Sequence, residues 1–436
     1  MGVGLALLNR LAGVKALDRF GLRAPVQRTV FQATKTGFRT LGAATRTFGA
    51  VKPQARPERL ATQPRRALFD LTPTDEQRLI QQAAREFGAE QLRPAASEAD
   101  SSCQAPAALL ERATGELGIS FVGVPESLGG AGTERSAITG VLIAEALAHG
   151  DLGLAVALLA PAAVSTALVL WGDEQQQARY LPSFVADDAP AAALAVLEPR
   201  PLFDPFVLKT TARPSAGGYL LDGVKSLVPG AARAELFVIA AELPGEGPAL
   251  FLVEADSAGL IVEAEPAMGL RAASMGRLVL DGVTVPASNL LAGDTAPGRA
   301  TAYADCIRLS RLGWAALAVG TAQAVLDYVI PYVNERAAFG EPISNRQSVA
   351  FMVADLGIEL EGMRLATYRA ASRAEQGRSF ARETMLARTL TGEYGMQIGS
   401  NGVQLLGGHG FVKEHPVERW YRDLRAAGLM EGAVLI

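Results

Sequence analysis

The sequence predicts a multi-domain α+β protein whose domains follow one another in the order α, β, α. Long runs with helical spacing fill residues 74–188 and return from residue 301 onward. Between them, residues 192–286 hold short alternating runs such as ELFVIAAEL, separated by Gly, Pro and Asp turns. A chain of 436 residues with 49% hydrophobic and 20% charged residues is long enough for two or three domains. This composition excludes a chain that is disordered throughout.

The first 68 residues differ in charge from the rest and are predicted to form a separate basic extension. Residues 1–66 carry 13 Lys and Arg against Asp18 and Glu58, and the remaining residues carry 28 basic against 43 acidic side chains. Over residues 26–48, the apolar and the basic side chains fall on opposite sides of a helical wheel. Three interpretations compete: a helix on an anionic membrane surface, an arm docked on the acidic body of its own oligomer, and an organelle transit peptide.

Residues 69–190 are predicted to form an N-terminal α-helical domain. Within it, residues 152–172 run for 21 positions without a charge, which is long enough to span a bilayer. The many alanines, Pro161 in the middle of the run and the acidic flanks Asp151 and Asp173 favour a buried helix of a helical domain instead.

The remaining residues divide into a β domain over 191–295 and a second helical domain over 296–436. Strand-like runs such as ALFLVEA and RLVLDGVTV mark the first part, and long helical runs such as SVAFMVADLGIELEGMRLATYRAASRAEQG mark the second. The chain has no internal repeat, and no predicted strand leads into the glycine loop of a Rossmann fold.

The cysteines and histidines argue against a metal site. Cys103 and Cys306 are too few for a disulfide framework or a thiolate metal site, and they are not in a C-x-x-C spacing. With three histidines and no H-E-x-x-H spacing, a zinc site would depend on carboxylates. We therefore expect no catalytic metal and a reducing, cytoplasm-like compartment.

Two motifs in the last third of the chain carry a family resemblance. RAAFGEPISNRQ and VQLLGGHGFVKEHPVERWYRDLRAAGLMEG stand at the separation found in acyl-CoA dehydrogenases, which residues 70–436 closely resemble. Weaker matches are VPESLGGAG, WGDEQQQARYLPSF and AMGLRAASMGRLVLDGVTVP. The resemblance implies a central β-barrel-like domain, a C-terminal four-helix bundle, FAD as cofactor and the oxidation of an acyl-CoA thioester in fatty-acid β-oxidation.

By that resemblance, Arg336, Phe339 and Gln347 would belong to a site for the adenine and diphosphate of FAD that spans two chains. The glycine-rich loop would contact the same cofactor through Gln404, Leu405, Leu406, Gly407 and Gly408. A guanidinium makes charge-assisted bonds to a diphosphate, and glycines let backbone amides approach it. Taken alone, LLGGHG would serve equally well as a glycine-rich helix end.

Glu431 falls where short- and medium-chain members of the family keep their catalytic base. A carboxylate there would remove a proton from the carbon next to the thioester carbonyl, and the apolar residues of LMEGAVLI would raise its pKa toward neutrality. The alternative is a solvated carboxylate near a chain end. Arg311 matches a family arginine near the base and would bind substrate, with a helix-surface charge as the alternative.

The segments that face the flavin in the family differ here. The family pattern T-E-P-G-A-G-S-D reads LEPRPLFD, so that Leu202 and Phe203 replace the Gly and Ser at the flavin. The pattern W-I-T reads Leu227, Val228 and Pro229, and proline has neither an N–H nor a hydroxyl to offer.

Two functions remain open from these residues. The first is an FAD-dependent acyl-CoA dehydrogenase that desaturates the α,β bond of an acyl-CoA and passes electrons to an electron-transfer flavoprotein. The second is a non-catalytic or half-catalytic partner subunit of a heteromeric acyl-CoA dehydrogenase. Retention of Glu431 favours the first, because a structural partner has no need of a buried carboxylate.

The sequence also leads to predictions about partners and cellular location. We expect a homo-dimer or tetramer, with a heteromer with a paralogue as the alternative, and no nucleic-acid partner. The expected location is the cytoplasm, with peripheral attachment to the inner face of a membrane through residues 1–50. If residues 1–50 are a transit peptide, the location is mitochondrial instead.

Overall fold

The computed structural model describes residues 72–121, 123–130, 136–186, 188–293 and 295–432. All the described helices and strands belong to the unit that spans Phe69–Ile436. The basic extension over residues 1–68, including the predicted membrane contact of residues 1–50, lies outside the described residues.

The first part of the described chain is helical, as predicted. Thr74 begins α4 with a capping box, because its hydroxyl accepts a hydrogen bond from the Gln77 N–H and the Gln77 side chain accepts one from the Thr74 N–H. The helices of this part are α4 (Asp75–Phe87), α5 (Arg93–Ser102), α6 (Ala107–Leu117), α7 (Ala137–Gly150), α8 (Leu152–Trp171) and α9 (Glu174–Val185).

The long uncharged run forms α8, with Pro161 inside the helix. The buried carboxylate of Asp151 caps its start by accepting a hydrogen bond of 3.0 Å from the Leu154 N–H. By length and composition, α8 and α10 (Ala296–Glu335) could each cross a membrane, but 56% and 61% of their apolar windows are buried inside the protein. Such burial agrees with the predicted helix in the core of a helical domain.

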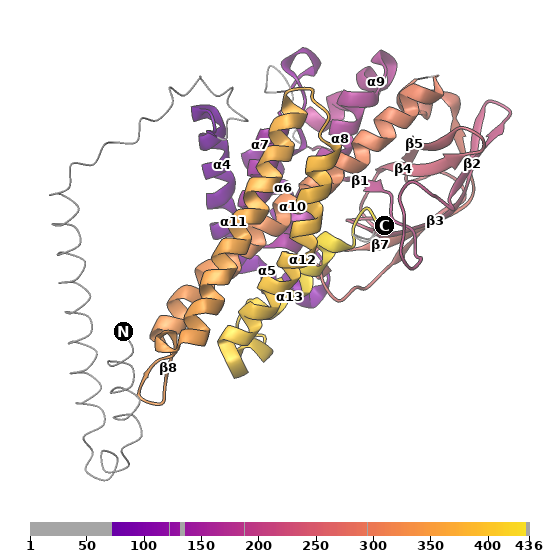
Figure 1. The fold of residues 1–436 in the computed structure, drawn as a ribbon. Coiled ribbons are helices and arrows are strands. Elements are labelled where there is room, and N and C mark those ends of the chain that lie inside the picture. Colours follow the sequence, from indigo (N-terminus) through magenta and orange to yellow (C-terminus); the bar gives the residue numbers. More distant parts are fainter. Residues whose placement is uncertain (1–71, 122, 131–135, 187, 294, 433–436) are drawn as a thin grey trace, which may run out of the picture. The chain divides into compact units, whose positions relative to one another are not determined.

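The middle part is a curled sheet at one end of the long helices (Figure 1). Its strands run in the order β1-β4-β2-β3-β7-β6, and β5 pairs with β4. The pair β1–β4 is parallel, and β3–β7 and β4–β5 are antiparallel. The strands are β1 (Ala192–Ala195), β2 (Thr211–Ser215), β3 (Gly218–Val228), β4 (Leu236–Leu243), β5 (Gly247–Glu254), β6 (Leu260–Ala264) and β7 (Gly276–Pro286).

An irregularity at the end of β3 shapes the segment that the family resemblance assigns to the flavin. The register between β3 and β7 shifts between Lys225 and Val228, and Leu227 takes a left-handed conformation with φ of 50°. The Leu227 N–H donates to a carboxylate oxygen of Glu265 at 2.7 Å, so side-chain contacts replace ladder bonds there. Pro229 follows directly after this bulge.

The last part of the described chain is the helical bundle predicted from the resemblance. Its helices are α10, α11 (Gln347–Glu375), α12 (Ala381–Leu406) and α13 (Val417–Leu424), and a small hairpin of β8 (Ala337–Ala338) and β9 (Glu341–Pro342) joins α10 to α11. The long helices run side by side, with the hairpin at their far tip (Figure 1). Trp420 of α13 is fully buried in the core of this bundle.

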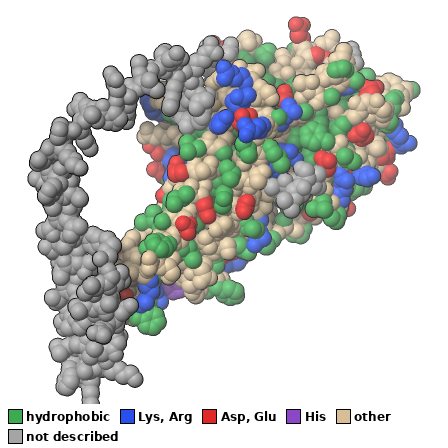
Figure 2. Space-filling view, viewed as in Figure 1, with side chains coloured by type: hydrophobic (Ala, Val, Ile, Leu, Met, Phe, Trp, Pro, Cys, Tyr) green, Lys and Arg blue, Asp and Glu red, His purple; other side chains and the backbone are tan. Residues whose placement is uncertain are grey.

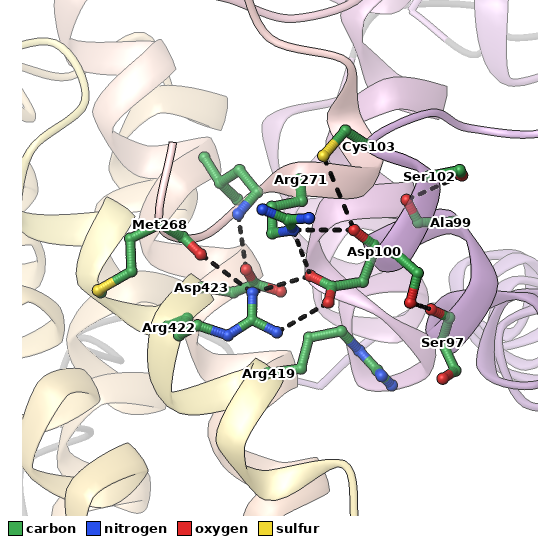
Figure 3. Close-up of polar contacts among 12 residues, drawn as sticks. Ser97, Ala99, Asp100, Ser102, Cys103, Met268, Arg271, Arg419, Arg422 and Asp423 are labelled. Carbon is green, nitrogen blue, oxygen red and sulfur yellow. Dashed lines mark hydrogen bonds and ion pairs between the residues drawn. The ribbon is translucent and has the colours of Figure 1, made fainter. Parts of the chain in front are cut away.

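A buried ionic cluster connects α13 to both other domains (Figure 3). Asp100 of α5 accepts hydrogen bonds of 2.8 and 2.9 Å from the guanidinium of Arg422, a bidentate pair. Arg271, from the turn between β6 and β7, donates to the Asp100 carbonyl at 2.8 Å. In the same turn, the Leu270 N–H donates to Asp423 at 2.6 Å. The helix that leads to Glu431 is therefore anchored on both sides.

Candidate active site

Glu431 lies in a segment without regular structure that follows α13. Its backbone is left-handed, with φ of 54°, and Gly432 has φ of 102°. The side chain is buried, so the alternative of a solvated carboxylate is wrong. Its Oε1 accepts a hydrogen bond of 2.8 Å from the Ser310 hydroxyl, whereas its Oε2 has no hydrogen-bond partner among the described residues.

The environment of Glu431 favours its protonated form. Burial raises the pKa of this carboxyl above its ordinary value, while the hydrogen bond from Ser310, the charge of Arg388, the Trp314 side chain and the charge of Arg311 oppose that shift. A carboxylate with one oxygen held and the other free, and with a raised pKa, is suited to accept a proton.

Glu431 lines a cavity of about 260 Å³ that is mostly apolar. It is the one carboxylate among the described residues that line this cavity. The walls come from α7, α8 and α10, and Pro229 of the flavin-facing segment closes another side. The larger wall residues are Val141, Val156, Leu159, Trp171, Leu194, Leu309, Leu312, Trp314, Leu317 and Met430.

Two arginines hold the backbone around Glu431. Arg311 of α10 donates from Nε and Nη2 to the Glu431 carbonyl at 3.0 and 2.8 Å, so it is not a simple helix-surface charge. Arg388 of α12 donates to the Gly432 carbonyl. The predicted role of Arg311 in substrate binding stays a prediction, because its guanidinium contacts the chain itself.

The loop between β1 and β2 packs against the same segment. An added Cβ at Gly432 would lie 2.6 Å from Cδ of Pro205 and 3.1 Å from the Phe203 carbonyl oxygen, so only glycine fits there. Phe203 is buried beneath the Arg200 guanidinium, which lies 5.1 Å from the ring centroid. Leu202, by contrast, points outward with φ of 48°.

A buried ion pair fixes the beginning of this loop. The carboxylate of Glu198 accepts hydrogen bonds from the backbone N–H groups of Lys209 and Thr210, at 2.8–3.0 Å, and from Lys225 Nζ at 3.1 Å. Lys225 is fully buried, and burial lowers its pKa to about 8. Glu198 therefore ties the beginning of the loop to its end and to β3.

The predicted adenine and diphosphate residues meet at the far tip of the bundle. Arg336 follows α10, Gln347 begins α11, and Gln404, Leu405 and Leu406 end α12. The ends of α10 and α12 touch, because the Tyr332 hydroxyl donates to the Leu406 carbonyl at 3.1 Å. Two motifs about 70 positions apart in the sequence thus lie side by side.

The tip residues fit the ADP part of FAD. Phe339 is 93% exposed, and no described residue pairs with the guanidinium of Arg336. An added Cβ at Gly407 or Gly408 would meet nothing within 4 Å, so the backbone there is open to a ligand. A diphosphate needs an unpaired cationic donor, which Arg336 offers, and backbone that it can approach closely, which the two glycines offer.

The residues that would face the isoalloxazine ring are apolar. Leu197 and Phe203 are buried in the core that joins the sheet to α8 and α10, and Pro229 reaches the cavity. Positions 197, 227 and 229 offer no side-chain hydrogen bond to a ring. Of these four positions, Pro229 is the one that lines the cavity within the described part of the chain.

Two residues of this site, Ser310 and Arg388, are not indicated by any motif in the sequence. Ser310 stands next to Arg311 in sequence, but its approach to Glu431 depends on how α10 packs against a segment over a hundred positions away. Arg388 lies within an unremarkable helical run, LARTL, that carries no motif.

Comparison with known proteins agrees with the fold. Family models for the acyl-CoA dehydrogenase N-terminal, middle and C-terminal domains match residues 74–188, 193–283 and 300–434. The chain belongs to the acyl-CoA dehydrogenase family. The predicted family, its domain order and its class of oxidoreductase are thereby confirmed.

Particular relatives extend this result. A mitochondrial short-chain specific acyl-CoA dehydrogenase from Bos taurus is 32% identical over 81% of this chain and 86% of its own. The structure of butyryl-CoA dehydrogenase from Megasphaera elsdenii superposes with a TM-score of 0.77 at 28% identity, over 84% of this chain and 97% of that one. An FAD complex of PigA reaches a TM-score of 0.76 at 28% identity, over 84% and 96%.

The family defines the cofactor class. Its members are flavoprotein oxidoreductases of fatty-acid β-oxidation that bind FAD, which confirms the predicted cofactor, and they form homo-oligomers.

Proposed function

We propose that this chain is a catalytically competent, FAD-dependent acyl-CoA dehydrogenase that desaturates the α,β bond of an acyl-CoA thioester with Glu431 as the base. One observation carries the proposal: a buried carboxylate with a free oxygen in a mostly apolar cavity. A buried carboxylate with one oxygen unpaired is costly, so its retention is hard to explain in a purely structural subunit.

Ser310, Glu431 and the cavity walls have different roles in proton removal. Ser310 holds Oε1 of Glu431, which leaves Oε2 to accept the proton from the carbon next to the thioester carbonyl. The walls around the carboxyl are mostly apolar, and burial raises its pKa above the ordinary value, which makes it a better proton acceptor. FAD, when bound, supplies the acceptor for the hydride that leaves the neighbouring carbon.

The same proposal assigns the cofactor residues. Arg336 and Gln347 would hold the diphosphate and adenine part, together with the glycine loop of residues 404–408. Pro229 and Leu197 would form an apolar wall for the ring.

The partners follow from the same reaction. The substrate would be an acyl-CoA, and an electron-transfer flavoprotein would accept the electrons. The relatives include a mitochondrial enzyme and bacterial ones, so the compartment, cytoplasmic or mitochondrial, stays a prediction.

A second function is favoured by one specific observation. Leu202, Phe203 and Pro229 replace family residues at the flavin, and the loop that holds two of them packs closely on Gly432. A chain altered in this way could lend its tip residues to a paralogue and act as a partner subunit.

The test is a spectrum of the full-length protein with FAD, followed by anaerobic titration with a series of acyl-CoAs. We expect bound flavin whose absorbance bleaches with a matching acyl-CoA, and a rate of bleaching at least about 1,000-fold lower for Glu431→Gln. The control is Glu116→Gln, whose side chain is 59% exposed on α6. A protein that takes up no flavin would contradict catalytic competence and favour the partner subunit.

A further inference from the structure

The segment that carries Glu431 has little regular structure to hold it. After α13, the short turn Arg425–Gly428 is followed by residues in left-handed conformations at Glu431 and Gly432. A left-handed conformation at a non-glycine residue persists only where the surroundings determine it. The position of the carboxylate must therefore depend on side chains from other elements.

The guanidinium of Arg388 donates to backbone carbonyls on both sides of Glu431. Its Nη2 donates to the Gly432 carbonyl, and its Nη1 donates to the Ala427 carbonyl at 3.3 Å. A longer contact of 3.5 Å reaches the Gly428 carbonyl. The guanidinium thus connects the residues before Glu431 with the one after it.

Arg388 is unusual because it is a buried cation that forms no ion pair with a carboxylate in the described part of the chain. Its side chain is 1% exposed, it forms no ion pair with a described residue, and its Nε has no hydrogen-bond partner. Burial lowers its pKa to about 10, so it remains charged at neutral pH. A buried charge of this kind is costly unless something in the site requires it.

Besides the neutral side chains of Ser310 and Trp314, a few titratable or charged groups act on Glu431. They are Arg311, Tyr303 and Cys306 from α10, Arg388 from α12, and Asp204 from the loop between β1 and β2, which acts through Arg311. Burial raises the pKa of the Cys306 thiol and of the Tyr303 hydroxyl, so both are neutral near pH 7. The two arginines are then the cations available to an ionised Glu431.

We propose that Arg388 is a positioning residue for the base: its guanidinium fixes the backbone of residues 427–432 so that the Glu431 carboxylate reaches into the cavity, and its charge favours the ionised carboxylate. The proposal rests on the proposed role of Glu431. Arg311 of α10 donates to the Glu431 carbonyl, and Arg388 of α12 donates to the Gly432 carbonyl, so guanidiniums from two helices hold neighbouring backbone carbonyls.

The test compares Arg388→Met, Arg388→Lys and a control, Arg382→Met, at an exposed position near the start of the same helix. For Arg388→Met we expect kcat to fall about 30-fold with KM changed less than about threefold, and the acid limb of the kcat profile to move to higher pH. Arg388→Lys should restore the pH profile but only part of kcat, because lysine keeps the charge but cannot donate to two carbonyls at once as the planar guanidinium does.

A second readout does not depend on catalysis. Hydrogen exchange in the wild-type protein should show protected amides around residues 427–432, and Arg388→Met should lose that protection there while α10 and α11 keep theirs. Unchanged exchange in this segment would overturn the proposal. So would a loss of kcat with an unmoved pH profile and exchange raised throughout the bundle, since that is a structural role alone.

The two proposals fail in different ways. If Glu431→Gln bleaches the flavin as fast as the wild type, the role of Glu431 as base is wrong, and the role of Arg388 in positioning a base falls with it. If Glu431→Gln abolishes bleaching but Arg388→Met changes neither exchange nor pH profile, only the role of Arg388 is wrong.

Discussion

At the scale of single residues, the site depends on backbone conformations that few residue types adopt. Glu431 and Gly432 follow one another in the left-handed region, and the second of them also lies against Pro205. The glycine is required for two reasons, its positive φ and the lack of space for a Cβ. These two reasons can be separated by experiment.

We predict that Gly432→Ala destabilises the protein by about 2–4 kcal/mol and greatly reduces activity, because the new Cβ would lie 2.6 Å from Pro205. The control is Gly217→Ala, at φ of 96° with nothing within 4 Å of an added Cβ. This variant has the strain of the positive φ without a steric clash. Thermal or denaturant unfolding of both variants measures the difference. Equal losses of stability would show that the contact with the loop is unimportant.

At the scale of elements, α13 is the connection between the ionic cluster and the base. Arg422 pairs with Asp100, and the neighbouring Asp423 binds the turn between β6 and β7 (Figure 3). Burial, and then the charge of the nearby buried Asp151, raises the pKa of Asp423 to about 7. In the unfolded chain the same carboxyl has its ordinary pKa of 3.8.

This shift predicts how stability varies with pH. The folded state holds more protons than the unfolded state between about pH 4 and pH 7, so the contribution of the Asp423–Asp151 pair is full below this window and is lost as pH rises through it. We expect Asp423→Asn to remove much of that slope, because asparagine keeps an acceptor for the Leu270 N–H without a charge. Asp281→Asn, at an exposed strand position, is the control.

Denaturant unfolding from pH 5 to pH 8 measures this effect. The wild type should lose up to a few kcal/mol relative to Asp423→Asn over this range. Parallel curves for the two proteins would contradict the prediction.

At the scale of the whole molecule, an apolar stripe on α11 remains uncovered. Phe351, Ile358 and Leu365 recur every seven positions and are 59%, 71% and 49% exposed. Figure 2 shows hydrophobic side chains lying among charged ones over the long helices. A repeat of seven places these three side chains on one face of the helix, and such a face usually packs against another chain. Homo-oligomers are typical of the family.

We therefore predict that Ile358→Glu dissociates the oligomer, because it places a charge in the middle of the stripe. Leu79→Glu is the matched control, since Leu79 is 68% exposed on α4, outside the stripe. Sedimentation or light scattering gives the mass of each variant. An Ile358→Glu protein that keeps its mass and its flavin would place the interface elsewhere.

The sequence by itself determined the order of the domains, the family and the cofactor class. Hydrophobic periodicity separates helices from strands, and the spacing of the arginine and glycine motifs is recognisable without coordinates. It also indicated a buried Glu431, because the residues on both sides are apolar. These features are local in the chain, or depend on spacing alone.

Only the tertiary structure decided how the base is held. Ser310, Arg388 and Gly432 come from α10, from α12 and from the segment after α13, and their contacts arise from packing between elements distant in sequence. The same holds for the raised pKa of Asp423, which depends on burial against Asp151. Residue spacing does not indicate such contacts, because burial and hydrogen bonding across domains exist only once the chain has folded.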